Sequence, residues 1–246
     1  MIDLHSHILA GIDDGASTLD DSIALVKHAA QHGVSKILAT PHIHFGTFDN
    51  DLPIIQKAFN ELTSRLQEEQ IDICVAYAAE VRICPEIILL AKTKKLPFMG
   101  KWHGLDLLLL EFPHSHILPG SEKLVDWLLK NNIKPMIAHP ERNRELWEFP
   151  ELLSPLKQRG CLFQITAASL VGDFGERSKN LAWQLLEEGT ATIVASDMHN
   201  LLRRPCKMRD AYKLVSERLG HQLANSLFIE NPSYIFESNL TAWTLN

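Results

Sequence analysis

A repeated alternation of short apolar segments and amphipathic helical patterns constrains the fold more than any other feature of the sequence. The apolar segments have the length of buried strands, and the stretches between them repeat apolar residues at helical spacing. Because the segments are too apolar to be half-exposed, they predict a parallel sheet covered by helices. Strands are expected over residues 1–4, 36–40, 73–79, 105–110, 134–138, 161–166 and 192–196.

The helices between these strands have recognisable starts. Thr18 and Asp21 form a capping box that opens the first helix, which continues to about Gln31 and is ended by Gly33. A second helix begins at Pro53. The others are expected over residues 85–91, 122–130, 152–159, 177–188, 207–219 and 221–226, and the last two finish the chain.

Two α/β architectures accommodate this alternation. An open doubly wound sheet would bind a dinucleotide, but no Gly-x-Gly-x-x-Gly follows the first strand. In a closed barrel the carboxyl ends of the strands converge on one face, where catalytic groups gather. Histidine, aspartate or glutamate follows most of the strands, and this favours a barrel with about seven repeats, one fewer than the standard eight. Residues 1–246 are expected to form one domain.

The residues at the strand ends are the ligand types of a metal site. His5 and His7 follow the first strand, and side chains two apart in an extended chain point the same way, so both imidazoles can reach one ion. An acidic turn follows, in which Gly15 is free to take a positive φ. The complete candidate set is His5, His7, Asp14, His42, Glu80, Glu111, His139, Asp197 and His199.

This set is too large for one ion of four to six ligands, so two or three divalent metals are expected. Buried carboxylates without cations would be very costly, and metal ions would compensate their charge. Mixed nitrogen and oxygen ligands suit manganese, which we favour, and also iron, zinc or magnesium. Any single histidine or glutamate at a strand end is more often a turn or capping residue, but chance rarely produces such agreement among six strand ends.

Composition excludes several other classes. The net charge of −6 is spread along the chain without a basic block, which argues against binding to nucleic acid or to an anionic membrane. The apolar run around Leu107–Leu110 is too short for membrane insertion, and Asp3 and His5 interrupt any apolar leader. The four cysteines lack C-x-x-C spacing, so a cytoplasmic, reduced setting is expected. The sequence leaves the oligomeric state open.

Several motifs resemble the PHP (polymerase and histidinol phosphatase) superfamily. The segments that carry the resemblance are His5-x-His7, the Asp-Asp-Gly turn, Thr40-Pro41-His42, Glu80, Ala138-His139-Pro140-Glu141-Arg142 and Ser196-Asp197-Met198-His199-Asn200. They look most like the bacterial protein-tyrosine phosphatase branch that accompanies capsular and extracellular polysaccharide biosynthesis. In some members of this branch basic residues follow the histidine after the second strand, where this chain has Ile43 and His44.

The resemblance implies a distorted (β/α)7 TIM-like barrel with a trinuclear metal site at the carboxyl ends of the strands. It implies that Glu80 bridges two of the ions. The three ligand sets that it implies are His5, His7, Glu80 and Asp197; Glu80, Glu111 and His139; and Asp14, His42 and His199.

Such a site would hydrolyse a phosphate ester with a metal-bound hydroxide as nucleophile, and Glu80 and Asp197 would count among the catalytic residues. Arg142 and Arg204 follow ligand loops, and their forked donors suit a phosphoryl group at the barrel mouth, where both are expected to be exposed. Arg203 could replace Arg204, and a solvated salt bridge explains either arginine equally well. His44 or His114 could supply a proton, although either is more often a rim residue. No cysteine has an arginine six positions later, which excludes a cysteine-based phosphate loop.

The function expected is therefore a metal-dependent protein-tyrosine phosphatase. The resemblance implies that its substrate is the Tyr-rich tail of a tyrosine kinase of polysaccharide synthesis. A small-molecule phosphatase of the histidinol-phosphate type is an alternative, and a nuclease is disfavoured by the lack of a basic groove. An amidohydrolase would share His-x-His, but it would normally have eight strands and would not combine Glu80 with Glu111 in its site. A complete ligand set weighs against a non-catalytic metal-binding assembly protein.

Overall fold

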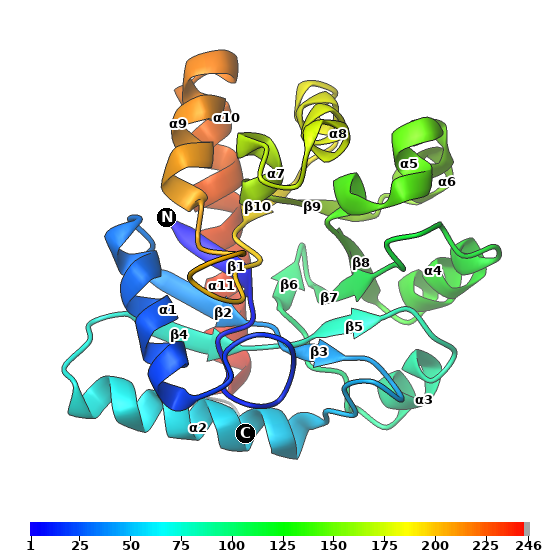
Figure 1. The fold of residues 1–246 in the computed structure, drawn as a ribbon. Helices are drawn as coiled ribbons and strands as arrows, with labels where there is room; N and C mark the ends of the chain where they lie inside the picture. The colour runs from blue at the N-terminus through cyan, green and yellow to red at the C-terminus, as the bar shows by residue number, and fades with distance from the viewer. Residues whose placement is uncertain (244–246) are drawn as a thin grey trace.

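Parallel strands close into a ring in the computed structural model, which describes residues 1–243 (Figure 1). The chain runs along the barrel wall seven times, and each passage is called a crossing here. Two of the seven crossings consist of two short strands, because β2 continues into β3 and β4 continues into β5. The crossings follow one another in sequence order. They are β1 (Ile2–Ser6), β2 with β3 (Lys36–Ala39 and His42–Ile43), β4 with β5 (Cys74–Tyr77 and Glu80–Arg82), β7 (Leu105–Glu111), β8 (Ile133–Ala138), β9 (Leu162–Thr166) and β10 (Ile193–Ala195).

Two backbone hydrogen bonds close the ring between its last and first strands. The Asp197 N–H donates to the His5 carbonyl at 2.8 Å, and the His7 N–H donates to the Met198 carbonyl at 2.9 Å. All neighbouring strands of the ring pair in parallel. The predicted α/β barrel with seven crossings is therefore confirmed, and the carboxyl ends of its strands share one face.

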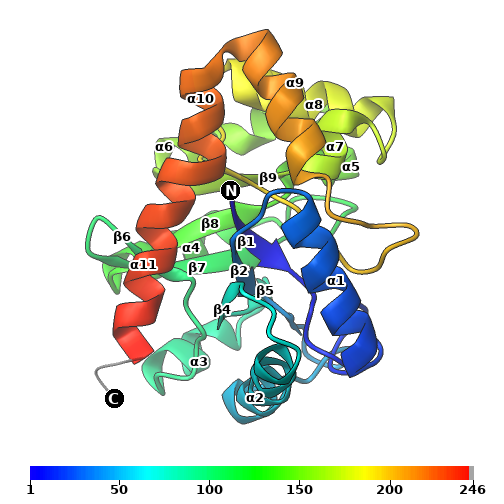
Figure 2. The ribbon, with the colours of Figure 1, turned by 90° about the vertical axis from the view of Figure 1, so that its left-hand side faces the viewer.

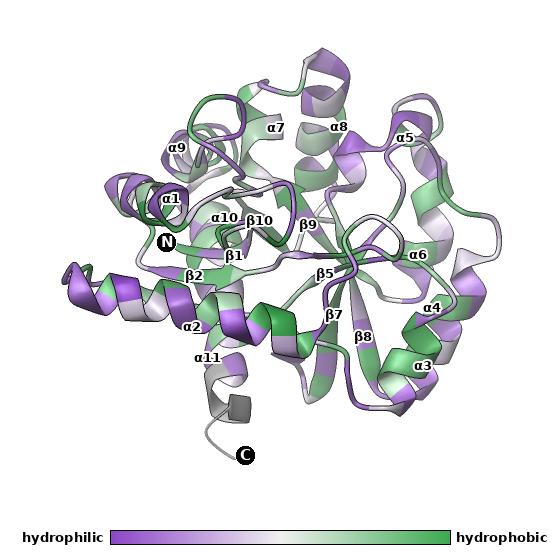
Figure 3. Ribbon diagram, turned by 60° about the horizontal axis from the view of Figure 1, so that its bottom comes forward, coloured by the Kyte–Doolittle hydropathy of each residue, from purple (hydrophilic) through white to green (hydrophobic). Residues whose placement is uncertain are grey.

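Helices surround the ring, and the larger ones are amphipathic. In α2, for example, Ile55, Ala58, Leu62 and Leu66 are buried at helical spacing. Figure 3 shows hydrophilic and hydrophobic stretches side by side along α2, α4 and α8, as expected of helices that cover a sheet with one side only. The helices are α1 (Leu19–Gln31), α2 (Leu52–Glu68), α3 (Ile87–Lys92), α4 (Ser121–Lys130), α5 (Arg144–Glu148), α6 (Ser154–Gln158), α7 (Ala167–Val171), α8 (Glu176–Glu187), α9 (Met208–Leu219), α10 (His221–Asn225) and α11 (Asn231–Trp243).

The expectation that a helix over 221–226 finishes the chain is wrong. After α10, a π-helical turn over Ser226–Glu230 leads directly into α11. Pro232 looks like a helix breaker in the sequence, but it directly follows the π-helical turn and the chain stays helical through it. The short strand β6 (Gly100–Trp102), which pairs antiparallel with β7, was also not predicted.

The helix α11 packs against the end of the barrel at which the strands begin. Its Ile235 and Phe236 are buried in one cluster with the inward-facing Leu4, Leu109 and Met136. At Gly100 in β6, a Cβ atom would lie 2.3 Å from the Ile235 carbonyl oxygen, so only glycine permits this approach. Figure 2 shows α11 running beside β6 along one side of the molecule. The strand beginnings are therefore filled with apolar side chains, and the opposite end is left for polar groups.

Among the helices of residues 1–243, none combines the length and the apolar character needed to cross a membrane.

Candidate metal centre

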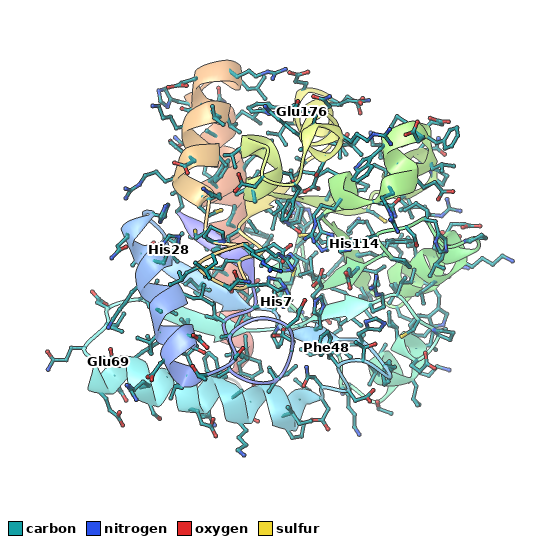
Figure 4. The ribbon with its side chains drawn as sticks, in the orientation of Figure 1. His7, His28, Phe48, Glu69, His114 and Glu176 are labelled. Atoms are coloured by element: carbon teal, nitrogen blue, oxygen red, sulfur yellow. The ribbon has the colours of Figure 1, made fainter. Side chains whose placement is uncertain are left out.

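The nine predicted ligands come together at the carboxyl ends of the strands. Asp14, His42, Glu80, Glu111, His139 and Asp197 line a cavity of about 250 Å³ there. His5, His7 and His199 are fully or almost fully buried beside it. In Figure 4, His7, Phe48 and His114 lie around the middle of the barrel mouth, whereas Glu69 and Glu176 point outward at the periphery.

One group of ligand atoms has the spacing expected around a single ion. The Nε2 atoms of His5 and His7 are 3.2 Å apart. Each lies 3.3–3.5 Å from Glu80 Oε2 and 3.4 Å from Asp197 Oδ1. Ligands on a tetrahedral ion with bonds of about 2.1 Å are about 3.4 Å apart. Glu80 Oε2 and Asp197 Oδ1 are buried without a hydrogen-bond partner, which is costly unless a cation satisfies them, so this group fits a metal ion.

A second group lies toward the α1 side of the cavity. Asp14 Oδ1 is 3.4 Å from His42 Nε2 and 3.3 Å from His199 Nε2. His199 Nε2 is buried and has no hydrogen-bond partner. With His7, these residues offer ligand atoms that all lie within 4.8 Å of one another. The spacing again suits one ion.

A third group lies on the far side of Glu80 and is less open. Glu80 Oε1 is only 2.7 Å from His139 Nε2, which is hydrogen-bond length. Glu111 approaches His42 Nδ1 at 3.8 Å and His114 Nε2 at 4.0 Å. Glu111, His114 and His139 can place one ligand atom each around a common point, so His114 joins the ligand candidates. Glu80 contacts members of all three groups and is the centre of the cluster.

Imidazoles and carboxylates of the cluster shift the pKa values of one another. Burial raises the pKa of Glu80, but His5, His42 and His139 lower it by more, so the carboxyl stays ionised. Burial and the Glu80 carboxylate raise the pKa of Glu111 to about 7. Burial lowers the pKa of His42, but the Glu80 carboxylate has the opposite effect, and the pKa is raised overall to about 10. Metal ions would replace these protons as the counter-charge.

Hydrogen bonds outside the cluster orient three of the imidazoles. His7 Nδ1 is 2.7 Å from Asp13 Oδ2, His5 Nδ1 is 3.0 Å from Gln164 Oε1, and His199 Nδ1 is 3.0 Å from the Asp197 carbonyl. Each of these acceptors favours a proton on Nδ1 and leaves the Nε2 lone pair free for a metal. The sequence analysis missed Asp13 and Gln164 as site residues. The sequence could have indicated Gln164, because it is a polar residue within an apolar strand segment.

Gln164 explains why β9 carries no ligand at its carboxyl end. Its Oε1 atom accepts from the His5 ring and also from the His139 backbone N–H at 3.2 Å. One buried amide therefore positions ligands from β1 and from the end of β8. This strand contributes an orienting group in place of a ligand.

We expect Gln164→Leu to fold and to bind divalent metal about 10–100-fold more weakly, the usual cost of removing an outer-sphere partner of a ligand. Manganese titration of the metal-free protein by calorimetry measures the affinity directly. Gln184→Leu, on the exposed face of α8, is the matched control. Equal affinities for both variants would refute the positioning role of Gln164.

Gly15 is required for space, and the expectation that it takes a positive φ is wrong. Eleven glycines have a positive φ, and Gly15 is not one of them. A Cβ atom on Gly15 would lie 2.1 Å from the His7 carbonyl oxygen and 2.5 Å from His7 Cβ. Within the turn, the Gly15 backbone N–H also donates a hydrogen bond to Asp13 Oδ1 at 2.9 Å. Glycine therefore lets the acidic turn lie directly on the ligand His7.

Arg142 and Arg204 line the cavity, but the expectation that they are exposed is wrong. Their side chains are 13% and 20% exposed, because both donate to Asp197 Oδ2, Arg204 at 2.6 Å. The Arg142 guanidinium also lies 4.5 Å from the centre of the Phe174 ring. Arg203 is exposed and does not line the cavity, so Arg204 is the arginine of this pair that lies at the cavity.

A third arginine in the cavity was not predicted. Arg82 Nε lies 3.4 Å from Glu111 Oε2, and its Nη1 atom is buried without a hydrogen-bond partner. It stands two residues after Glu80 on β5, and this spacing in a strand places both side chains on one face. This spacing from Glu80 could have indicated Arg82 as a cavity residue from the sequence. His44 and His114 line the cavity as well.

Comparisons with known proteins identify the family of this chain. A sequence model of the family described as "Capsular polysaccharide synthesis, CpsB/CapC" matches residues 1–237. The chain is 38% identical over 225 residues to the tyrosine-protein phosphatase YwqE of Bacillus subtilis, and the match covers 91% of this chain and 87% of that protein. It is 31% identical over 244 residues to the tyrosine-protein phosphatase CpsB of Streptococcus agalactiae, with coverages of 97% and 99%.

Solved structures extend the comparison to the fold. The chain matches, with a TM-score of 0.89 and 35% identity, a structure from work on YwqE from Bacillus subtilis and CpsB from Streptococcus pneumoniae, described as unique metal-dependent tyrosine phosphatases. That match covers 97% of this chain and 95% of the other. A β-aspartyl dipeptidase from Fervidobacterium islandicum, at 16% identity and a TM-score of 0.59, shares the fold alone. The family match and the identities over nearly the whole chain place this protein in the CpsB/CapC family of capsular polysaccharide synthesis.

Proposed function

We propose that this protein is a metal-dependent tyrosine-protein phosphatase of capsular polysaccharide synthesis. The observation that carries the proposal is the combination of metal-ligand groups and half-buried arginines around one cavity of about 250 Å³. The relatives named above are tyrosine-protein phosphatases at 31–38% identity. The cavity also suits an aryl phosphate, because Phe48 lines it and stacks on His42 with ring centres 5.4 Å apart.

In this proposal the ligand groups hold two or three divalent ions, with manganese favoured. The ions supply a nucleophile at neutral pH and positive charge for the phosphoryl oxygens. Arg142 and Arg204 present guanidinium groups to the same cavity, and Asp197 fixes both of them. Arg82 adds a further cation on the Glu111 side. A phenol leaving group has a pKa of about 10 and needs little help from an acid, so no proton donor is assigned.

Three finer assignments belong to the same proposal. The PHP superfamily is the wider group to which we assign the chain, on the basis of the ligand motifs quoted from the sequence. Residues 1–246 act as one domain. The physiological substrate is the Tyr-rich tail of a tyrosine kinase of polysaccharide synthesis, which is consistent with the capsular role of the family.

Metal removal is the first test of the function. We expect a chelator to abolish turnover of p-nitrophenyl phosphate and of a tyrosine phosphopeptide, and added manganese to restore both, because the metal would supply the nucleophile and would satisfy buried ligand atoms such as Glu80 Oε2 and Asp197 Oδ1. Histidinol phosphate serves as the comparison substrate for the small-molecule alternative. Phosphatase activity that persists in protein shown by elemental analysis to be metal-free would refute the proposal.

The arginines give a second test. We expect Arg142→Ala and Arg204→Ala each to lower kcat/KM on phosphotyrosine by about ten- to a hundredfold, the loss of a charge-assisted contact worth about 1.5–3 kcal/mol. Inhibition by inorganic phosphate should weaken in parallel. Arg203→Ala, which removes an exposed arginine beside the same loop, is the control and should change neither quantity. Wild-type kcat/KM in both cavity variants would contradict the assignment.

A further inference from the structure

A second cavity adjoins the metal cavity and shares two of its residues. It has a volume of about 400 Å³ and is lined by His114, Arg142, Arg144, Trp147, Phe174 and Ser178. His114 and Arg142 line both cavities. The second cavity is built by the start of α5, the start of α8 and the loop after β7. A ligand that reaches the metal cavity therefore has this second depression directly beside it.

Arg144 is an exposed arginine at the second cavity, and no carboxylate of residues 1–243 pairs with it. The acidic groups of its own segment already have partners. Glu145 accepts from the Ile117 N–H at 2.8 Å, and Glu148 pairs with Arg177 at 2.6 Å. Glu141 is buried and accepts from Ser169 and the Thr166 backbone. The Arg144 guanidinium is thus available to an external anion.

The remaining walls of the second cavity are aromatic and held in place. Trp147 Nε1 donates to the Glu141 carbonyl at 2.7 Å, which fixes the indole ring. The Phe174 ring packs on the Arg142 guanidinium, whose charge is already paired with Asp197. The backbone N–H of Arg144 donates to the His114 carbonyl at 2.7 Å, so the start of α5 is tied to the loop after β7. The cavity therefore offers rigid apolar walls and one unpaired cation.

We propose that this cavity binds an anionic side chain that neighbours the phosphotyrosine in the substrate polypeptide, with Arg144 as its cationic partner. The inference rests on the proposed phosphatase function and adds substrate selectivity to it. An extended peptide rises about 3.3 Å per residue, so a side chain within a few residues of the phosphotyrosine can reach an adjoining cavity. A carboxylate and a second phosphoryl group share the chemistry that Arg144 recognises.

The test compares substrates in the metal-loaded protein. Four are used: p-nitrophenyl phosphate, and phosphotyrosine peptides flanked by glutamate, by a second phosphotyrosine or by lysine. We expect Arg144→Ala to leave turnover of p-nitrophenyl phosphate unchanged and to lower kcat/KM about tenfold, through KM, on an anionic peptide. Comparison of the glutamate and doubly phosphorylated peptides shows which anion is preferred. Arg144→Glu should reverse the preference and favour the lysine peptide.

A binding measurement complements the kinetics. A labelled peptide carrying a non-hydrolysable phosphonate in place of the phosphate should bind the wild type more tightly than Arg144→Ala when its flanks are glutamate, and equally when they are lysine. Arg203→Ala removes an exposed arginine that lines neither cavity and is the matched control.

The outcomes separate the two proposals. If the wild type hydrolyses p-nitrophenyl phosphate but shows no preference among the peptides, or if Arg203→Ala loses as much as Arg144→Ala, the second-cavity inference is overturned. If the metal-loaded wild type hydrolyses none of the four substrates, the phosphatase function itself is wrong.

Discussion

Glu80→Gln is expected to fold normally, to bind less metal than the wild type and to lose nearly all phosphatase activity. Glu80 lies at the centre of the ligand cluster, with Oε2 within 3.0–3.5 Å of nitrogen atoms of His5, His7 and His42 and Oε1 2.7 Å from His139. Glutamine keeps the volume but presents a neutral amide with one weakly coordinating nitrogen. Loss of an outer-sphere partner costs about 10–100-fold, so loss of a shared ligand should cost more.

Metal counting and single-turnover kinetics measure this effect together. Glu61→Gln, on the exposed face of α2, is the matched control and should behave as the wild type. Asp14→Asn should be milder than Glu80→Gln, because Asp14 contacts only the group formed with His42 and His199. Full metal occupancy with wild-type turnover in Glu80→Gln would rule out a shared ligand.

Gly15→Ala is expected to destabilise the protein and to weaken metal binding at the same time. The added Cβ would collide with the backbone of His7, at 2.1 Å from its carbonyl oxygen, so the chain itself must move. Overpacking of this kind costs about 1–3 kcal/mol. In a chain of this size each kcal/mol lowers Tm by about 2–4 °C. Because His7 is a proposed ligand and its ring contacts Asp13, the displacement should also weaken metal binding.

Thermal unfolding with and without manganese separates the two effects. Gly104→Ala is the control, since Gly104 has a φ of +85° and open space around its Cα atom. That variant should lose stability through backbone strain and keep its metal content. If Gly15→Ala kept both the wild-type Tm and the wild-type metal content, the close approach would have no structural consequence.

The sequence predicted the barrel, and it predicted that the nine candidate ligands share one face, because both depend on local patterns. The apolar strand segments recur regularly, and most of them lead into a histidine or a carboxylate at the same end. Parallel strands then bring those ends together without further information. Thr18 forms the predicted capping box with Asp21, and α1 ends at Gln31 as expected. These features needed no knowledge of long-range packing.

The rule that side chains alternate between the two faces of a strand does not predict the backbone irregularities at the candidate ligands. Leu4 faces the barrel interior, so His5 on a regular strand would face outward, but the register shift between Asp3 and Ser6 reverses this. Ala138 faces the interior as well, and His139 also reaches it because its φ is +31°. Asp197 has a φ of +51°. Such left-handed residues are strained, and the surrounding structure over-determines them.

Some of the missed features depend on partners far along the chain. Gln164 accepts from His5, which is 159 residues away. The helix α11 is held by contacts such as that of Phe236 with the inner barrel cluster, and no local pattern announces them. Arg142 and Arg204 were placed correctly at the cavity, but their burial follows from Asp197, which accepts from both.

The seam between β1 and β10 would couple metal binding by the proposed ligands to closure of the barrel. Ser196 donates to Asp3 across 193 residues, and on this seam His5 and His7 meet Asp197. During synthesis, the two histidines emerge long before the aspartate, so a nascent chain would at first hold only part of the proposed ligand set. Closing so long a loop costs chain entropy, and an ion that binds both edges of the seam repays some of that cost only once the ring is whole. With the proposed ligands, metal content would therefore report on barrel closure.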